Sequence, residues 1–304
     1  MVAIHKTKSD ILIFDRDQVQ RSRQRALPRF EEYDFLFQWS KNQLFDRLHD
    51  INRQFESALQ IGSRAALLQG EHDKISHLLT CDLTAQPLTP DAPAYVQASE
   101  EFLPIAPQSM DLILSNLNLH TVNDLPGALL QIRNALKADG LFMAAMLGGE
   151  TLHELRKILT DIELNTSGGI SPRIAPFADK QQMGDLLQRA GFALPVVDSD
   201  IITVTYDNVF KLFHDLRGMG ENNSIAERNK QFVSKDFFMR TAQAYHDQFA
   251  QSDGRIVASF EIIFLLGWSP HESQQKPLRP GSAEHRLADL LGATEHSTGE
   301  KTKP

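Results

Sequence analysis

The spacing of apolar residues along the chain predicts an alternation of strands and helices. Short apolar runs have the length of buried strands, whereas apolar residues spaced three and four positions apart predict helices with one buried face. The predicted strands cover residues 57–61, 77–81, 110–114, 141–147, 201–206 and 256–268.

A well-marked helix is predicted between the third and fourth of these strands. Apolar residues recur every three or four positions from Leu125 to Leu136, and Asp124 before them is a suitable N-cap. An Asp-Gly pair at residues 139–140 predicts a turn into the next strand. Strand, helix and strand in this order predict a βαβ unit, with parallel pairing and a right-handed crossover.

Further helical patterns flank this unit. One covers residues 33–52 and another residues 150–162. Asp179 and Gln182 have the spacing of a capping box, which marks the start of a third helix. A helical insertion is predicted at about residues 209–251, between the last two strands.

Composition and charge narrow the function classes. The chain has 304 residues, of which 41% are hydrophobic and 23% charged, as in ordinary globular proteins. Its formal net charge of −8 argues against nucleic acid as a partner. No apolar run reaches the roughly 20 residues of a membrane-spanning helix. With one cysteine, Cys81, and scattered histidines, no structural metal site is expected.

The first 40 residues are predicted to form a helical arm, and residues 271–304 a flexible polar tail. The arm carries Arg21, Arg23, Arg25 and Arg29, a run typical of a solvated helical face. The alternative is an arm that contacts an acidic partner or an anionic substrate, or that associates the chain peripherally with a membrane. Residues 1–10 lack the apolar region of a signal peptide, and nearby acids are unlike a mitochondrial presequence. A cytoplasmic location is therefore expected.

Ligands of open parallel sheets bind beyond the carboxyl ends of the strands. Asp82 directly follows the second predicted strand, where a carboxylate can accept hydrogen bonds from both hydroxyls of a ribose. The alternative is an ordinary turn or cap aspartate.

Four segments, in chain order, look like successive motifs of class I methyltransferases. They are Ala-Leu-Gln-Ile-Gly at 58–62, Cys-Asp-Leu at 81–83, Glu-Glu-Phe-Leu-Pro at 100–104 and Met-Asp-Leu-Ile-Leu-Ser-Asn at 110–116. The resemblance implies an α/β, Rossmann-like fold over residues 41–270, with a mostly parallel sheet, a C-terminal antiparallel hairpin and the helical insertion. It also implies S-adenosylmethionine as the cofactor. The residues that would hold it are Gly62, Arg64, Asp82, Glu100, Glu101 and Asn116.

Within that superfamily the chain most resembles a group that includes a mitochondrial assembly factor of respiratory complex I, described as an arginine hydroxylase, and its bacterial relatives. The resemblance rests on residues 13–16, 148–156, 216–222 and 267–268. It implies a protein substrate, such as a subunit of complex I. A more distant resemblance is to the methyltransferase that esterifies a malonyl carrier protein.

The glycine-rich cofactor loop of the superfamily is altered here. Gln60 replaces an acid, and Arg64 and Ala66 stand in place of two glycines that permit close approach to the cofactor. Three interpretations stay open. Arg64 pairs with the carboxylate of the cofactor, or it pairs with Asp82 and closes the pocket of a non-catalytic protein, or the chain keeps a partner-binding role with weak cofactor affinity.

Candidate catalytic residues each have a simpler alternative. His120 would lie near the sulfonium as a general base, or it merely caps a strand end. Glu150 could face an acceptor, or stabilise a helix N-terminus. Glu221 could contact a basic substrate such as an arginine side chain, or be a solvated loop acid. A hydroxylase needs an oxidant or metal, and no 2-His-1-carboxylate spacing is present.

Overall fold

The computed structural model describes residues 12–62, 64, 73–85, 94–167, 169–275 and 292. The chain divides into a compact unit, Met1–Pro270, and a second unit, His271–Pro304. All helices and strands named below belong to the first unit. Most of the predicted tail lies outside the described residues.

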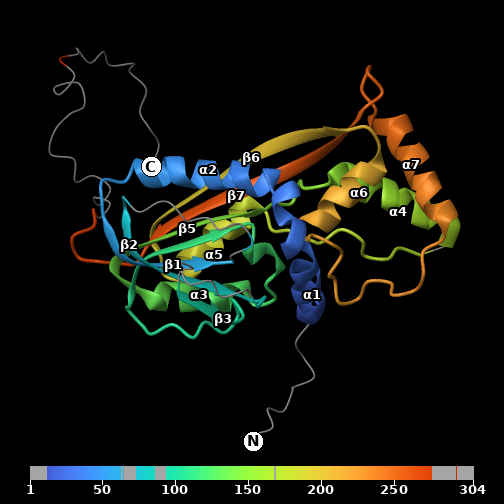
Figure 1. The fold of residues 1–304 in the computed structure, drawn as a ribbon. Helices are drawn as coiled ribbons and strands as arrows, with labels where there is room; N and C mark the ends of the chain where they lie inside the picture. The colour runs from blue at the N-terminus through green and yellow to red at the C-terminus, as the bar shows by residue number, and fades with distance from the viewer. Residues whose placement is uncertain are drawn as a thin grey trace, which may run out of the picture. The chain divides into compact units, whose positions relative to one another are not determined.

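The described residues form a seven-stranded sheet in the order β3-β2-β1-β4-β5-β7-β6 (Figure 1). β1, β2, β3, β4 and β5 are parallel, and β7 runs antiparallel to both β5 and β6. This arrangement confirms the predicted Rossmann-like methyltransferase fold with its antiparallel hairpin. The strands are β1 (Phe55–Ile61), β2 (Ile75–Asp82), β3 (Ala94–Gln97), β4 (Met110–Asn116), β5 (Leu136–Leu147), β6 (Ala193–Tyr206) and β7 (Ile256–Trp268).

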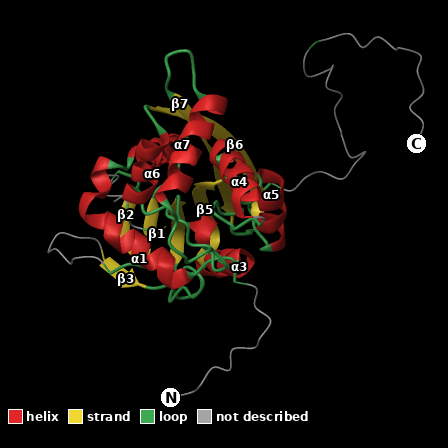
Figure 2. Cartoon of the chain, turned by 90° about the vertical axis from the view of Figure 1, so that its right-hand side faces the viewer, coloured by secondary structure: helices red, strands yellow, loops and turns green. Residues whose placement is uncertain are grey.

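Helices cover both faces of the sheet (Figures 1 and 2). On one face α3 (Leu125–Ala135) and α5 (Lys180–Arg189) share an apolar core with β1, β4 and β5. On the other, α2 (Phe35–His49), α4 (His153–Ser167), α6 (Val209–Gly218) and α7 (Lys235–Phe249) share a second core. β1, β4, β5 and β7 contribute to both cores and are therefore buried on both faces of the sheet. Among the described helices, none is long and apolar enough to cross a membrane.

The local start signals of the helices act as predicted. The Asp124 carboxylate accepts a hydrogen bond from the Gly127 amide at the start of α3. Asp179 and Gln182 form the predicted capping box before α5. Both caps satisfy amides that would otherwise lack partners in the first helical turn.

Two strands differ from the sequence pattern. β3 was not predicted, because its four residues, Ala-Tyr-Val-Gln, are only partly buried and too few to stand out as a strand pattern. β5 begins at Leu136, so the predicted turn at 139–140 lies inside a strand. Asp139 has a positive φ of 59°, and the β4–β5 register shifts between Met110 and Leu112. The Asp-Gly pair therefore marks an irregularity in the strand and not its beginning.

The N-terminal helix α1 (Arg16–Ala26) is tied to the segment that follows α6. Phe14 forms an antiparallel bridge with Ile225, and the Asp15 carboxylate is 3.0 Å from the Arg228 guanidinium. The 3-10 helix η1 (Leu27–Glu32) then connects α1 to α2. α2 runs across residue 40, the predicted boundary between arm and domain.

Candidate functional site

The carboxyl ends of β1 and β4 meet in a tight contact between Gly62 and Asn118. Gly62 has a φ of +82°, and a Cβ atom there would lie 2.5 Å from Cγ of Asn118. Its amide donates to the Cys81 carbonyl at 2.8 Å. A positive φ and so close a neighbour together require glycine at this position.

A buried charge cluster centres on Glu100, which is 1% exposed. Its Oε1 accepts hydrogen bonds from Arg23 Nη1 at 2.9 Å and Asn118 Nδ2 at 2.6 Å, and its other oxygen accepts one from Arg16. Arg23 also donates to the Asn118 carbonyl and the Thr121 hydroxyl, at 3.1 and 2.8 Å. Burial disfavours the ionised form of Glu100 and would raise its pKa. The charges of Arg23 and Arg16 outweigh this effect of burial and lower the pKa of Glu100 to about 2.

A second buried cluster joins the altered cofactor loop to the segment after α6. Arg64 Nη1 donates to Glu221 Oε1 at 2.6 Å and to the Met219 carbonyl at 3.1 Å. Arg64 Nη2 donates to the Leu117 carbonyl at 2.6 Å. The other carboxylate oxygen of Glu221 lies 3.1 Å from His120 Nε2. Glu221 is thus held from both sides.

These contacts fix the protonation of Glu221 and His120. Burial alone would raise the pKa of Glu221, but the charge of Arg64 and the hydrogen bond from His120 hold it well below its usual range. Burial lowers the pKa of His120, although Glu221 opposes that shift. Since an ionised carboxylate only accepts, neutral His120 donates through Nε2–H and keeps its lone pair on Nδ1. That Nδ1 is buried and has no hydrogen-bond partner among the described residues.

A cavity of about 410 Å³ adjoins this second cluster. Glu221 lines it, with 14% of its side chain exposed, whereas the His120 side chain is fully buried. Its walls are mostly apolar and come from α4, α6, α7 and the segment before α5. The lining side chains include Thr121, Leu152, Leu155, Phe177, Phe213, Leu216 and Phe237.

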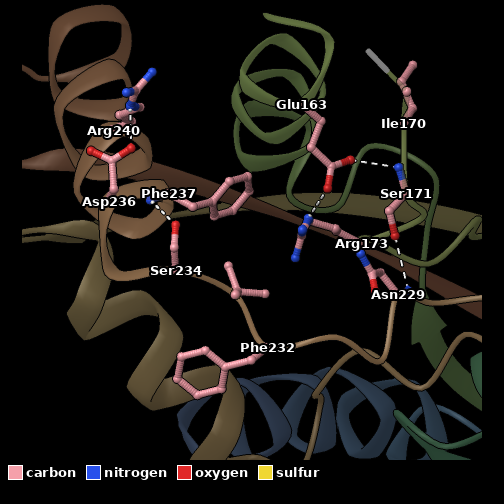
Figure 3. Close-up of a pocket in the computed structure, with 12 residues that line it drawn as sticks. Glu163, Ile170, Ser171, Arg173, Asn229, Phe232, Ser234, Asp236, Phe237 and Arg240 are labelled. Carbon is pink, nitrogen blue, oxygen red and sulfur yellow. Dashed lines mark hydrogen bonds and ion pairs between the residues drawn. The ribbon is translucent and has the colours of Figure 1, made fainter. Parts of the chain in front are cut away.

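A neighbouring cavity of about 490 Å³ lies between α4, α7 and the segments at 169–173 and 229–234 (Figure 3). Glu163 accepts hydrogen bonds from Arg173 Nε at 2.6 Å and from the Ser171 amide at 2.7 Å. The Arg173 guanidinium lies 4.4 Å from the centroid of the Phe237 ring. Arg173 and Phe237 line both cavities and form the wall between them.

The other predicted catalytic residue does not line the described cavities. Glu150 is exposed, and its amide donates to Glu261 Oε2 at 3.0 Å. The predicted catalytic set is therefore brought together only in part: His120 and Glu221 meet, and Glu150 lies apart in the turn before α4.

Several predicted cofactor residues are engaged by the protein itself. Asp82 is buried, and its Oδ1 accepts from the amide and hydroxyl of Thr84, both at 2.7 Å. The Asn116 side chain bonds to α2, through the Ser40 hydroxyl at 2.6 Å and the Phe37 carbonyl at 3.0 Å. Glu101 accepts from the Asn123 amide at 2.7 Å.

The described residues include groups that suit S-adenosylmethionine and contacts that occupy the same edge of the sheet. The positive-φ glycine after β1 and the acid after β2 are suitable groups, but Asn118 packs against Gly62 where a ligand would approach. The acidic group of Glu100 is already neutralised by Arg16 and Arg23.

Arg23 corrects the prediction of a solvated arm. It is 1% exposed and forms the buried pair with Glu100, whereas Arg29 pairs with Glu32 at the surface. Val19, Arg23 and Ala26 are spaced four and three apart and share the buried face of α1. That spacing could have predicted the burial of Arg23 from the sequence, because it places Arg23 on the same helical face as two apolar residues.

Comparison with known proteins identifies a methyltransferase domain at residues 62–144. The chain is 39% identical to the mitochondrial arginine-hydroxylase NDUFAF5 of Danio rerio over 288 residues, which cover 91% of this chain and 89% of that protein. It is 37% identical over 190 residues to malonyl-(acyl-carrier protein) O-methyltransferase of Laribacter hongkongensis, covering 62% of this chain and 61% of that one.

The fold is also similar to that of phosphoethanolamine N-methyltransferase 2 of Haemonchus contortus, solved with phosphomonomethylethanolamine and S-adenosylhomocysteine. The TM-score is 0.51 at 13% identity, and the match covers 84% of this chain and 60% of that chain.

The similarity to NDUFAF5 corrects the expected location. NDUFAF5 of Danio rerio and of Homo sapiens are both named as mitochondrial proteins, which contradicts the predicted cytoplasmic location. Two of the acids near the N-terminus were a poor guide, because Asp17 lies in the first turn of α1 and Asp15 is its N-cap. The match extends over nearly all of this chain and nearly all of its relative, including the insertion that walls the cavity. The chain, with its methyltransferase domain, therefore belongs to the family of the mitochondrial arginine-hydroxylase NDUFAF5.

Proposed function

We propose that this chain modifies a basic side chain of a protein substrate during assembly of respiratory complex I. The observation that carries the proposal is Glu221, an ionised carboxylate on the wall of an otherwise largely apolar cavity. The apolar walls would accept the methylene stem of an arginine or lysine, and the carboxylate would meet its charged end. The name of the relative, an arginine-hydroxylase, supports arginine.

The proposal is tested in cells that lack the chain. Complex I subunits from these cells are compared with those from complemented cells by peptide mass spectrometry. A basic residue that carries one extra CH₂ only in complemented cells indicates methylation, and one extra oxygen indicates hydroxylation. Complementation with Glu221→Gln should abolish the modification. Glu163→Gln is the matched control, because Glu163 is also a buried acid paired with an arginine, but in the neighbouring cavity. If no subunit differs between the cells, the proposal is wrong.

We propose S-adenosylmethionine as the cofactor, supported by the methyltransferase domain and by the fold neighbour solved with S-adenosylhomocysteine. Its binding would require the arginines around Glu100 and the Asn118 side chain to move. Calorimetric titration tests this. Micromolar binding that is lost in Asp82→Ala supports the proposal, and no binding at millimolar ligand to folded protein contradicts it.

A non-catalytic assembly factor is the second candidate, and the pairing of Glu100 and Asn116 with groups of the same chain favours it. In that case the Glu221→Gln and Asp82→Ala variants would restore complex I activity as fully as the unchanged chain. A carrier-protein methyltransferase is favoured by the 37% identity to the malonyl-carrier enzyme. Transfer of a labelled methyl group to a malonyl carrier protein in vitro would support it.

A further inference from the structure

Arg64 occupies a site that is built to hold a guanidinium group. Its side chain is 2% exposed, and it meets one carboxylate and two carbonyl oxygens. The aromatic ring of Phe37 lies 4.8 Å from the guanidinium carbon. A planar group with several donors at its edge and an apolar face matches these partners, whereas a compact ammonium group does not.

The backbone supports this site from two sides. Leu117 directly follows β4 and has a positive φ of 45°, and its carbonyl faces Arg64. Gly220 has a φ of +79°, and a Cβ there would lie 3.2 Å from Cα of Arg23 in α1. Glycine therefore lets the segment from Met219 to Glu221 pass close to α1 and present its acceptors to Arg64.

The guanidinium site and the 410 Å³ cavity share Glu221 and Met219 as a common wall. Arg64 lies on one side of the Glu221 carboxylate and the cavity on the other. In this state the charge that would attract a cationic substrate is already neutralised by an arginine of the same chain.

We propose that Arg64 is an intramolecular occupant of a guanidinium-binding site and competes with the guanidinium of a substrate arginine for Glu221. This inference rests on the proposed function, since it assigns an internal competitor to the same site. It predicts that removing the Arg64 side chain strengthens the binding of guanidinium ligands. If Arg64 instead supported substrate binding, its removal would weaken that binding.

The experiment uses methylguanidinium as the probe and thermal unfolding as the readout. Arg64→Ala leaves the site vacant, so methylguanidinium at tenfold excess over its dissociation constant should raise the Tm of this variant by about 2–4 °C. The unchanged chain and Arg64→Ala/Glu221→Gln should show much smaller shifts. Arg47→Ala is the matched control, because Arg47 also pairs with a carboxylate, Asp198, and lies over an aromatic ring, but at the surface.

The proposal is overturned if methylguanidinium fails to stabilise Arg64→Ala, or stabilises Arg47→Ala equally. If Arg64→Ala does not fold, NMR of the unchanged chain provides the test. The Arg64 Nε–H signal, assigned by its absence in Arg64→Lys, should shift with arginine methyl ester and not with lysine methyl ester. An unchanged signal would also overturn the proposal. Both readouts need no turnover, so they stay informative if no complex I subunit is found to be modified.

Discussion

Glu100 shows how a single buried residue makes stability depend on pH. Its pKa falls from 4.5 to about 2 in the folded chain, because Arg23 and Arg16 outweigh the effect of burial. The ionised form therefore contributes stability that is present above pH 4.5 and lost as the pH falls towards 2. We expect the free energy of unfolding, measured in urea, to fall over this range, and Glu100→Gln to remove much of that fall. Glu32→Gln should leave it unchanged, because Glu32 pairs with Arg29 at the surface.

A comparison of Gly62 with Gly254 distinguishes the energetic cost of a left-handed backbone from the cost of a steric clash. Both have a φ of +82°, but a Cβ at Gly62 meets Asn118 at 2.5 Å and one at Gly254 meets nothing within 4 Å. Gly254→Ala should cost about 1–2 kcal/mol, the penalty of a left-handed backbone alone. Gly62→Ala should cost about 2–5 kcal/mol, since overpacking adds to that penalty. If chemical denaturation shows the same loss of unfolding free energy for both variants, the Asn118 side chain moves aside at little cost.

At the scale of the element, α1 is a structural part of the site and not a free arm. Arg23 is fully buried against Glu100, whereas Arg25, two positions on, is exposed. Arg23→Met should destabilise the fold by about 3–5 kcal/mol, because it leaves a buried carboxylate short of one charged partner. Arg25→Met should change stability by less than about 0.5 kcal/mol. Chemical denaturation measures both, and similar losses would contradict the burial of Arg23.

The buried contacts of α1 are an example of what could not be predicted from the sequence. Local patterns sufficed for most elements: the capping box placed α5, and the apolar run at 256–268 placed β7. β3 has no such run, so only its parallel pairing with β2 reveals it. The partners of the buried arginines could not be predicted from local patterns, because Arg23 and Glu100 lie 77 positions apart in the sequence and Arg64 and Glu221 lie 157 apart. Which charges meet is decided by packing over the whole sheet.

At the scale of the whole molecule, two segments far apart in the sequence contact the ligand-binding edge of the methyltransferase fold. α1 supplies Arg23 to Glu100, and the segment after α6 supplies Glu221 to Arg64. Phe14 and Ile225 join these two segments directly. A ligand that separated these contacts would also loosen the N-terminal helix, so we expect ligand binding to be coupled to the position of α1.

The C-terminal boundary of the fold gives the last prediction. The compact unit ends at Pro270. Just before it, the Ser269 amide donates a hydrogen bond to the Gly140 carbonyl at 2.8 Å, and the Ser269 carbonyl accepts one from the Asp139 amide at 3.2 Å. A chain that ends after Gln274 should unfold at the same temperature as the full chain. One that ends after Gly267 loses both hydrogen bonds and the half-buried Trp268, and should be destabilised by about 3 kcal/mol. Thermal unfolding distinguishes the two, and a marked loss in the longer truncated chain would show that residues 275–304 contribute to the fold.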